Sequence, residues 1–282
     1  MGEIDKLCKP VLRWVGGKRG IINEIVKYAP KTHNTYYEPF LGGGAVLFHL
    51  QPKIAIVNDI NYELINLYSI IRDDVDGLIL DLKEHVIDIN YYKSIRSLDR
   101  LPNYHMEVGR LKKASRMIYL NKTCFNGLYR VNSRGEFNVP FSVARTGKII
   151  DEDRLRAVSR YLNNNDVLFQ NQDFYESMRS ACNNDFIYID PPYDVDSRCD
   201  NPNFTSYTAR GWCSTDLTIL RELCDKLSAR GVKFLMSNSA TDRVIGEFKD
   251  YNIVHIKAGR SVNPKANRSC DEVLIMNYQG GT

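Results

Sequence analysis

The chain has 282 residues, of which 43% are hydrophobic, and it carries a net charge of +4. This composition excludes an intrinsically disordered chain and allows one large α/β domain, with or without an inserted second domain. No stretch reaches the ~20 apolar residues that a membrane helix needs, and the N-terminus lacks the apolar run of a signal peptide, so we expect a cytoplasmic protein.

Short apolar runs rich in Val, Ile and Tyr recur along the chain, as in strands that are covered on both faces. Helical spacing separates several of them, most clearly over residues 215–227, where Thr215 can cap the helix. This alternation predicts a doubly wound, mostly parallel sheet in an α/β fold. The expected strands cover residues 35–40, 54–59, 167–173, 186–189, 233–238, 252–256 and 272–277.

Residues 62–150 interrupt the alternation. Amphipathic patterns predict helices over residues 63–71, 75–85, 91–97 and 107–120. The segment 126–141 follows, in which Ser133-Arg134-Gly135 separates two alternating runs and is typical of a hairpin turn. Basic residues cluster here, which permits a nucleic-acid partner. We therefore expect a main domain formed by residues 1–61 and 151–282, with residues 62–150 inserted as a helical domain that carries a β-hairpin.

A glycine-rich segment, Phe40-Leu-Gly42-Gly-Gly-Ala45, follows the first expected strand. Glycine lets the backbone pass close to a ligand, and the start of a helix adds free N–H groups. Asp59 ends the next strand about twenty residues further on, where a carboxylate can hold both hydroxyls of a ribose. Together they predict a nucleoside-cofactor site; the alternative is a tight turn followed by a solvated aspartate.

The N-terminal segment Arg13-Trp14-Val-Gly16-Gly-Lys18 resembles part of a phosphate loop. That motif requires Ser or Thr after the lysine, and Arg19 stands there instead. We expect the segment to supply an aromatic wall, Trp14, and hydrogen-bond donors to a ligand. Trp14 as a plain core residue is the alternative.

Asp190-Pro191-Pro192-Tyr193 closes the expected strand 186–189, at the point where a parallel strand opens into a ligand crevice. The aspartate can accept a hydrogen bond from an exocyclic amine, while the prolines fix the backbone so that a carbonyl faces the same amine. Tyr193 can stack on a flat ring. The motif therefore predicts a pocket for a base, with a simple strand terminator as the alternative.

In chain order, these motifs resemble those of Dam-like DNA adenine-N6 methyltransferases. The resemblance spans nearly the whole chain and implies a class I S-adenosylmethionine-dependent methyltransferase fold with a Rossmann-like sheet. Residues 1–61 and 151–282 would be the catalytic, cofactor-binding domain, and residues 62–150 the target-recognition domain. The matching segments are residues 12–18, 38–44, 58–59, 126–130 with 135–140, 173–174 and 190–193.

The resemblance also implies roles for individual residues around S-adenosylmethionine. Trp14, Gly16 and Lys18 would lie near its methionine end, Phe40 and Gly42 along its body, Asp59 on its ribose, and Asp173 with Phe174 at its adenine.

For catalysis, the resemblance assigns Asp190, Pro191, Pro192 and Tyr193. Hydrogen bonds from an adenine amine to the Asp190 carboxylate and the Pro191 carbonyl would localise its lone pair in line with the sulfonium methyl group, without a covalent enzyme intermediate. The base must leave the duplex to reach them, with Tyr193 as its stacking partner. Cytosine N4 stays open as a target.

The expected partner is double-stranded DNA, and the resemblance implies G-A-T-C as the site. Arg130 can present its fork to guanine, and Leu128 and Pro140 can contact thymine methyl groups; a phosphate contact is the alternative for Arg130. Phe125 would flank the gap left by the flipped base. Tyr207 lies in a polar loop suited to phosphates or to plain solvent exposure. The DNA-binding set is Arg13, Phe125, Asn126, Leu128, Arg130, Pro140 and Tyr207.

The five histidines and seven cysteines form no ligand spacing, so we expect no metal. We expect a monomer, and the sequence leaves a restriction-modification, a phage and a housekeeping role open. Methylation of RNA or of a protein amide, and a catalytically silent DNA-binding module on the same fold, are the competing hypotheses.

Overall fold

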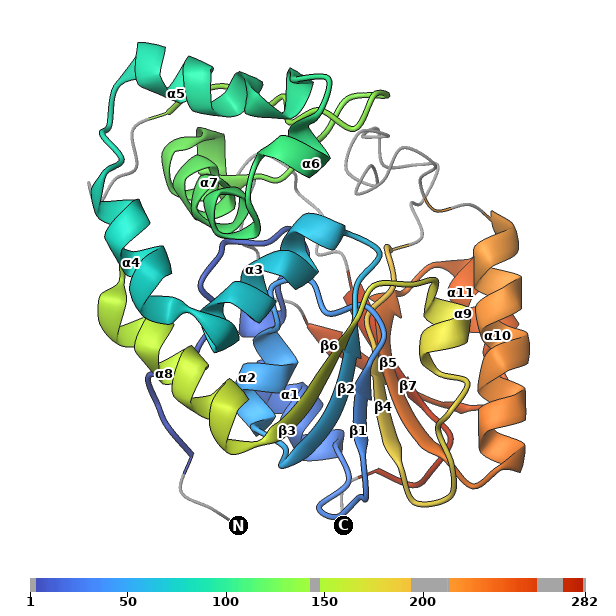
Figure 1. Ribbon diagram of the computed structural model, residues 1–282. Coiled ribbons are helices and arrows are strands. Elements are labelled where there is room, and N and C mark those ends of the chain that lie inside the picture. Colours follow the sequence, from blue (N-terminus) through green and yellow to red (C-terminus); the bar gives the residue numbers. More distant parts are fainter. Residues whose placement is uncertain (1–3, 143–147, 194–211, 213, 258–270, 281–282) are drawn as a thin grey trace.

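A mostly parallel sheet forms the centre of the molecule. The computed structural model describes residues 4–142, 148–193, 212, 214–257 and 271–280 (Figure 1). The sheet has seven strands in the order β3-β2-β1-β4-β5-β7-β6, and β7 runs antiparallel to both of its neighbours. The predicted doubly wound, mostly parallel sheet is confirmed, whereas the sequence did not predict the direction of β7. The strands are β1 (Tyr36–Glu38), β2 (Ile54–Asn58), β3 (Asp166–Gln170), β4 (Phe186–Ile189), β5 (Lys233–Ser239), β6 (Asn252–Lys257) and β7 (Asp271–Met276).

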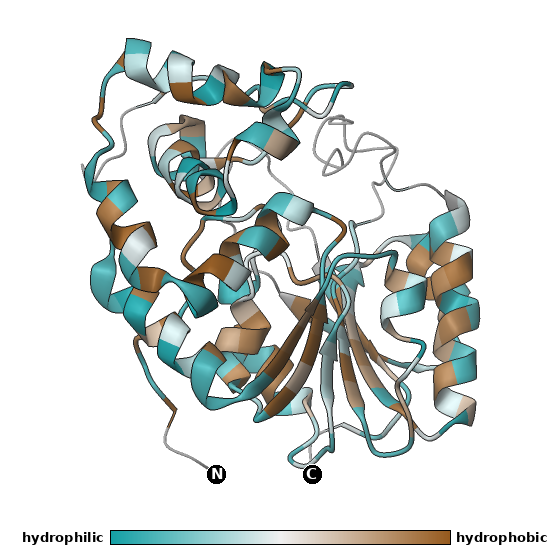
Figure 2. Cartoon of the chain, in the orientation of Figure 1, coloured by the Kyte–Doolittle hydropathy of each residue, from teal (hydrophilic) through white to brown (hydrophobic). Residues whose placement is uncertain are grey.

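Helices cover both faces of the sheet (Figure 1). Alternate side chains of β4 enter the two layers, because Phe186 and Tyr188 join the larger hydrophobic cluster while Ile187 and Ile189 join the second. Figure 2 shows hydrophobic residues along the central strands and hydrophilic residues on much of the outer helical surface. One face carries α1 (Ile22–Tyr28), α2 (Ala45–Leu50), α3 (Tyr62–Asp73) and α8 (Glu152–Asn164), and the other α9 (Phe174–Ser177), α10 (Ser214–Ala229) and α11 (Asp242–Glu247).

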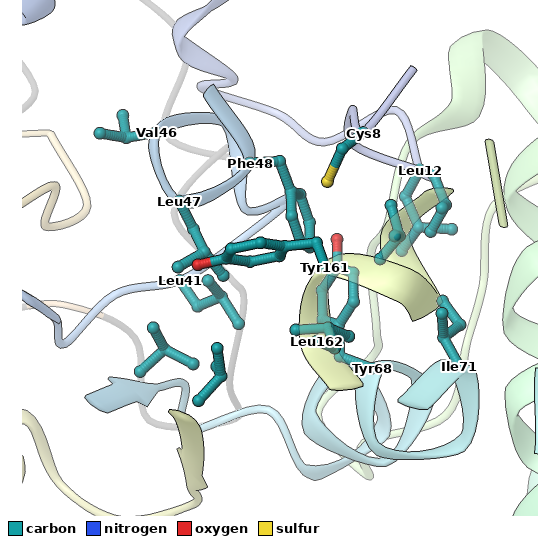
Figure 3. Packing of buried hydrophobic residues seen from close by; sticks show 14 of the residues in the cluster. Cys8, Leu12, Leu41, Val46, Leu47, Phe48, Tyr68, Ile71, Tyr161 and Leu162 are labelled. Atoms are coloured by element: carbon teal, nitrogen blue, oxygen red, sulfur yellow. The ribbon is translucent and has the colours of Figure 1, made fainter. Parts of the chain in front are cut away.

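Aromatic side chains fill the larger cluster. The ring centroid of Phe48 in α2 lies 5.3 Å from that of Tyr68 in α3 and 6.1 Å from that of Tyr161 in α8 (Figure 3). The hydroxyl of the buried Tyr68 also donates a hydrogen bond of 2.8 Å to the carbonyl oxygen of Gly43. This bond fixes the glycine-rich segment after β1 against α3, so the core positions the segment in which a cofactor site is predicted.

The segment between β2 and β3 is mostly helical, as predicted. Side chains of α3 and α4 belong to the larger cluster together with the sheet, and the boundary at residue 62 stays a prediction. The expected helix over residues 107–120 begins later, because Val108 and Gly109 are extended. None of the helices in the described ranges is long and apolar enough to cross a bilayer. The helices after α3 are α4 (Val75–Lys83), α5 (Ile89–Ser97), α6 (Tyr104–Glu107) and α7 (Arg110–Thr123).

The chain after α7 forms an irregular hairpin. A short 3-10 helix, η3 (Phe125–Gly127), precedes it, and the inner of two isolated bridges pairs Val131 with Phe137. The turn lies at the predicted place, where Gly135 has a φ of +79° and donates its N–H to the carbonyl of Asn132. Isolated bridges replace the continuous ladder of a regular hairpin.

Candidate functional site

The order of the strands reverses between β1 and β4. The chain winds outward from β1 to β2 and β3 on one side, and from β4 to β5 on the other. Ligands of doubly wound sheets bind outside the carboxyl ends of the strands at such a point. Gly42, Asp59 and Asp190 follow β1, β2 and β4 respectively, so the fold brings the predicted motifs to the same edge of the sheet.

The glycine-rich segment lies under Trp14. Gly42 has a φ of +49°, and a Cβ atom there would lie 3.0 Å from the Cδ1 atom of Trp14, so two separate constraints favour glycine. Trp14 is half-buried, packs against the larger core cluster and stacks on Tyr129 with ring centroids 5.1 Å apart. Trp14 therefore covers this segment, as an aromatic wall would, and also packs on the core, as a plain core residue would.

Asp59 holds the same segment from the other side. Its Oδ2 accepts a hydrogen bond of 2.9 Å from the N–H of Gly42, and its Oδ1 accepts one of 2.9 Å from the N–H of Asn61. Burial raises the pKa of Asp59 to about 6, although both N–H groups oppose the shift, so the group is ionised at neutral pH. Each oxygen retains a lone pair that a hydroxyl group could use.

Aromatic side chains pack together at the start of the glycine-rich segment. Phe40 and Phe174 stack with centroids 5.3 Å apart, and Trp212 meets Phe40 edge-on at 5.7 Å. Asp173 is exposed and its Oδ1 accepts a hydrogen bond from the N–H of Tyr175, which caps α9. Trp212 was not predicted, because it belongs to no motif and is far along the chain from Phe40 and Phe174.

Asp190 is paired with Lys18. The Nζ atom of Lys18 lies 2.8 Å from Oδ1 of Asp190 and also donates to the carbonyl of Gly16 at 2.7 Å. Ser237 donates a second hydrogen bond, of 3.1 Å, to the same Oδ1 atom. Burial raises the pKa of Asp190, while Lys18 and Ser237 oppose the shift. Among the described residues Oδ2 makes no hydrogen bond, so this oxygen can accept one from a ligand.

This ion pair was not predicted. Lys18 was expected near the methionine end of the cofactor, whereas in the structure its side chain, only 5% exposed, brings the ammonium group to the carboxylate of Asp190. The two residues belong to distant segments, and no local pattern links them. A contact of Lys18 with a cofactor stays a prediction.

Glu38 is a second buried carboxyl group near Asp190. It is 2% exposed and accepts a hydrogen bond of 2.7 Å from the hydroxyl of Tyr36. Burial is the main cause that raises the pKa of Glu38 to about 8, and the charge of Asp190 adds to it. Glu38 therefore keeps its proton at neutral pH and adds no negative charge beside Asp190.

Two side chains contact Tyr193, one at its hydroxyl and one over its ring. Its hydroxyl donates a hydrogen bond of 2.7 Å to Oε2 of Glu272, and the Nζ atom of Lys18 lies 4.4 Å from its ring centroid. Glu272 was not among the predicted site residues, because a glutamate at the start of a strand carries no motif.

Asn121 joins the N-terminal segment to the predicted DNA-binding residues. It is 5% exposed, and its Oδ1 accepts a hydrogen bond of 2.9 Å from the N–H of Arg13. Its Nδ2 donates to the carbonyl oxygens of Arg13 and Gly127, both at 2.8 Å. Arg13 therefore lies beside Phe125 and Asn126, which are also exposed. Sequence reasoning missed Asn121.

The remaining predicted DNA-binding residues differ in exposure. Arg130 and Pro140 are exposed, and the Nε atom of Arg130 donates a hydrogen bond of 2.7 Å to Oδ1 of Asn138. Leu128 is half-buried and packs against the small cluster around Tyr92 and Tyr119, so less of it is available for a methyl contact.

The loop that contains Tyr207 lies outside the described residues. In the described ranges, no group of three or more His, Cys, Asp and Glu side chains is arranged to hold a metal ion.

Comparison with known proteins supplies independent findings. Residues 14–262 match the family described as D12 class N6 adenine-specific DNA methyltransferase. The Type II methyltransferase M1.LlaDCHI of Lactococcus lactis subsp. cremoris is 37% identical over 274 residues, which cover 96% of this chain and 95% of that relative. The Type II methyltransferase M.MjaIII of Methanocaldococcus jannaschii is 38% identical over 96% of this chain and 99% of its own. A DNA adenine methylase of Haemophilus influenzae is 31% identical over 95% of this chain and 93% of its own.

Proposed function

Because the chain belongs to the D12 class of N6 adenine-specific DNA methyltransferases, we propose that it uses S-adenosylmethionine to methylate an adenine flipped out of duplex DNA, within the sequence G-A-T-C. One observation carries the proposal. Asp190 lies at the same edge of the sheet as the hydrogen-bonded pair Gly42 and Asp59, where the strand order reverses. We further propose that the enzyme acts as a monomer in the cytoplasm.

The residues after β1 and β2 suit the proposed cofactor. The absence of a Cβ at Gly42 lets Trp14 pack directly against the backbone of this segment, and the Asp59 carboxylate keeps lone pairs for two ribose hydroxyls. Phe40 and Phe174 offer apolar ring surface beside them for the adenine. S-adenosylmethionine supplies an electrophilic methyl group on a sulfonium when bound. Trp14, Gly16, Lys18 and Asp173 complete the proposed set.

The residues after β4 position the target amine. Lys18 and Ser237 hold Oδ1 of Asp190, which leaves Oδ2 to accept a hydrogen from the adenine N6 group. The carbonyl of Pro191 accepts the other hydrogen, and the ring of Pro192 restricts the backbone that presents it. Both bonds localise the lone pair of N6, and the fixed geometry lowers the cost of aligning it for transfer. Tyr193 stacks on the flipped base.

Arg13 and the chain around the hairpin form the proposed DNA surface. Asn121 holds the Arg13 backbone beside η3, so Arg13, Phe125 and Asn126 face the duplex together. Arg130 and Pro140 are exposed for base contacts, and the exposed part of the half-buried Leu128 side chain belongs to the same surface. Tyr207 would contact the backbone phosphates.

Methyl transfer from labelled S-adenosylmethionine tests the proposal directly. Duplex oligonucleotides with one G-A-T-C site, with a scrambled site, and with cytosine or N6-methyladenine in place of the target adenine on both strands would be compared with RNA of the same sequence. We expect label only in the duplex with an unmodified G-A-T-C site. Equal labelling of the scrambled duplex would reject the site, labelling of RNA alone would reject the substrate, and DNA binding without any labelling would indicate a silent module.

Replacing Arg130 with alanine should weaken discrimination at one base pair. If its guanidinium group reads guanine, kcat/KM on G-A-T-C should fall by about 10- to 100-fold, with a much smaller fall on duplexes already substituted at that guanine. Arg179, whose side chain is 77% exposed and which lies outside the hairpin segment, is the control, and R179A should change kcat/KM little. An equal loss in R130A on every duplex would mean that Arg130 contacts phosphate.

A further inference from the structure

The reversed direction of β7 brings an additional side chain to the site. The parallel strands end at the edge where Asp190 follows β4, whereas the antiparallel β7 begins at that edge. Glu272 is near the start of β7 and lies opposite Ser239 at the end of β5 in the strand register. A strand that ran parallel to β5 would place this residue at the far edge of the sheet.

Glu272 and Lys18 hold Tyr193 at different points. The carboxylate accepts the hydrogen bond from the phenolic hydroxyl at 2.7 Å, at the tip of the ring, while the Lys18 ammonium lies over the ring itself. The orientation of a tyrosine depends on two side-chain torsions, and a bond at the hydroxyl restrains both of them. Glu272 also lies close enough to Asp190 for its charge to contribute to the raised pKa of that aspartate.

We propose that Glu272 is a positioning residue for the target base, which acts by holding the Tyr193 ring in the orientation that stacks on the base while Asp190 receives the amine. Lys18 occupies space over the same ring and on Oδ1 of the same carboxylate, so its ammonium group must stay at the edge of the pocket or move when the base enters. The hydrogen bond from Tyr193 to Glu272 is at the hydroxyl end of the ring, so it does not depend on a movement of Lys18. This inference rests on the proposed function.

Four variants of the pair test the inference: E272A, Y193F, the double variant that combines these two, and E272Q. E272A and Y193F each remove the hydrogen bond, and each should lower kcat/KM by about 10- to 100-fold, as expected when a group that orients the substrate is misplaced. The double variant should be no more than about twofold worse than Y193F, because only one interaction is lost. E272Q keeps an acceptor oxygen and should fall by no more than about threefold. Glu222, an exposed glutamate on α10, is the matched control, and E222A should behave as the wild type.

Two further measurements separate positioning from folding. The first is that affinity for S-adenosylmethionine and the unfolding temperature should be close to those of the wild type in Y193F and E272Q. The second uses a duplex with 2-aminopurine at the target position. Its fluorescence increase should be smaller with Y193F and E272A than with the wild type. Losses that multiply in the double variant, or a wild-type rate in E272A, would overturn the inference. If the wild-type protein methylates no DNA, the proposed function is wrong and this inference falls with it.

Discussion

Replacing Asp190 with alanine should abolish methyl transfer, with kcat reduced by about 10³-fold or more, while the affinity for S-adenosylmethionine changes little. The carboxylate is the proposed acceptor for the adenine amine, and loss of one preorganised partner of a reacting group costs about 10²- to 10³-fold in known enzymes. The proposed contacts to the ribose and to the body of the cofactor come from the segments after β1 and β2, and these segments are held by Asp59 and Tyr68 rather than by Asp190. Steady-state kinetics and calorimetric titration of the cofactor would measure the two quantities separately.

A second variant controls for the ion pair. D190A leaves the buried ammonium group of Lys18 without its carboxylate, which destabilises the site as well as removing the acceptor. D190N keeps an acceptor oxygen and the volume, so it should fold more nearly as the wild type and retain a measurable residual rate. Turnover in D190A close to that of the wild type would contradict the assignment of Asp190.

The sheet was predictable because burial on both faces leaves a continuous apolar signal in each strand. β4 shows this most clearly, since all four of its residues are buried. The end of β1 was less predictable: Pro39 has no N–H to donate, and the strand stops at Glu38, before the expected residue 40. The direction of β7 could not be predicted, because a buried strand has the same pattern in either direction.

The site was predictable where residues are adjacent in sequence and not where they come from distant segments. The Gly42 segment and the Asp190 motif each carry their own signal, and their place at the ends of β1 and β4 follows from the alternation of strands and helices. The bonds from Lys18 to Asp190 and from Tyr193 to Glu272 join segments far apart in the chain, with no spacing to reveal them. The order of the strands, with β7 beside β5, accounts for the bond to Glu272, whereas Lys18 reaches Asp190 from the 3-10 helix over Lys18–Gly20, before α1.

Replacing Lys18 with methionine should shift the pH dependence of methyl transfer. Asp190 accepts the amine hydrogen as a carboxylate, so activity should fall as the pH drops below the pKa of this group. Burial already raises that pKa and the positive charge of Lys18 opposes the rise, so K18M should raise the pKa further. The acidic limb of the kcat profile should therefore move to higher pH by about one to three units. The shift is read well below the pKa of Glu38, which is about 8 in the wild type, so that the titration of Glu38 stays separate from the acidic limb.

The variant K18R distinguishes the charge of Lys18 from its contact with the cofactor. It keeps the positive charge beside Asp190, so its acidic limb should stay near that of the wild type even if the larger guanidinium group lowers kcat. S-adenosylmethionine affinity is measured for all three proteins. If K18M weakened cofactor binding and left the acidic limb in place, Lys18 would act through the cofactor, as the sequence motif predicts. A shifted limb with unchanged cofactor affinity would show that Lys18 keeps Asp190 ionised for the target amine.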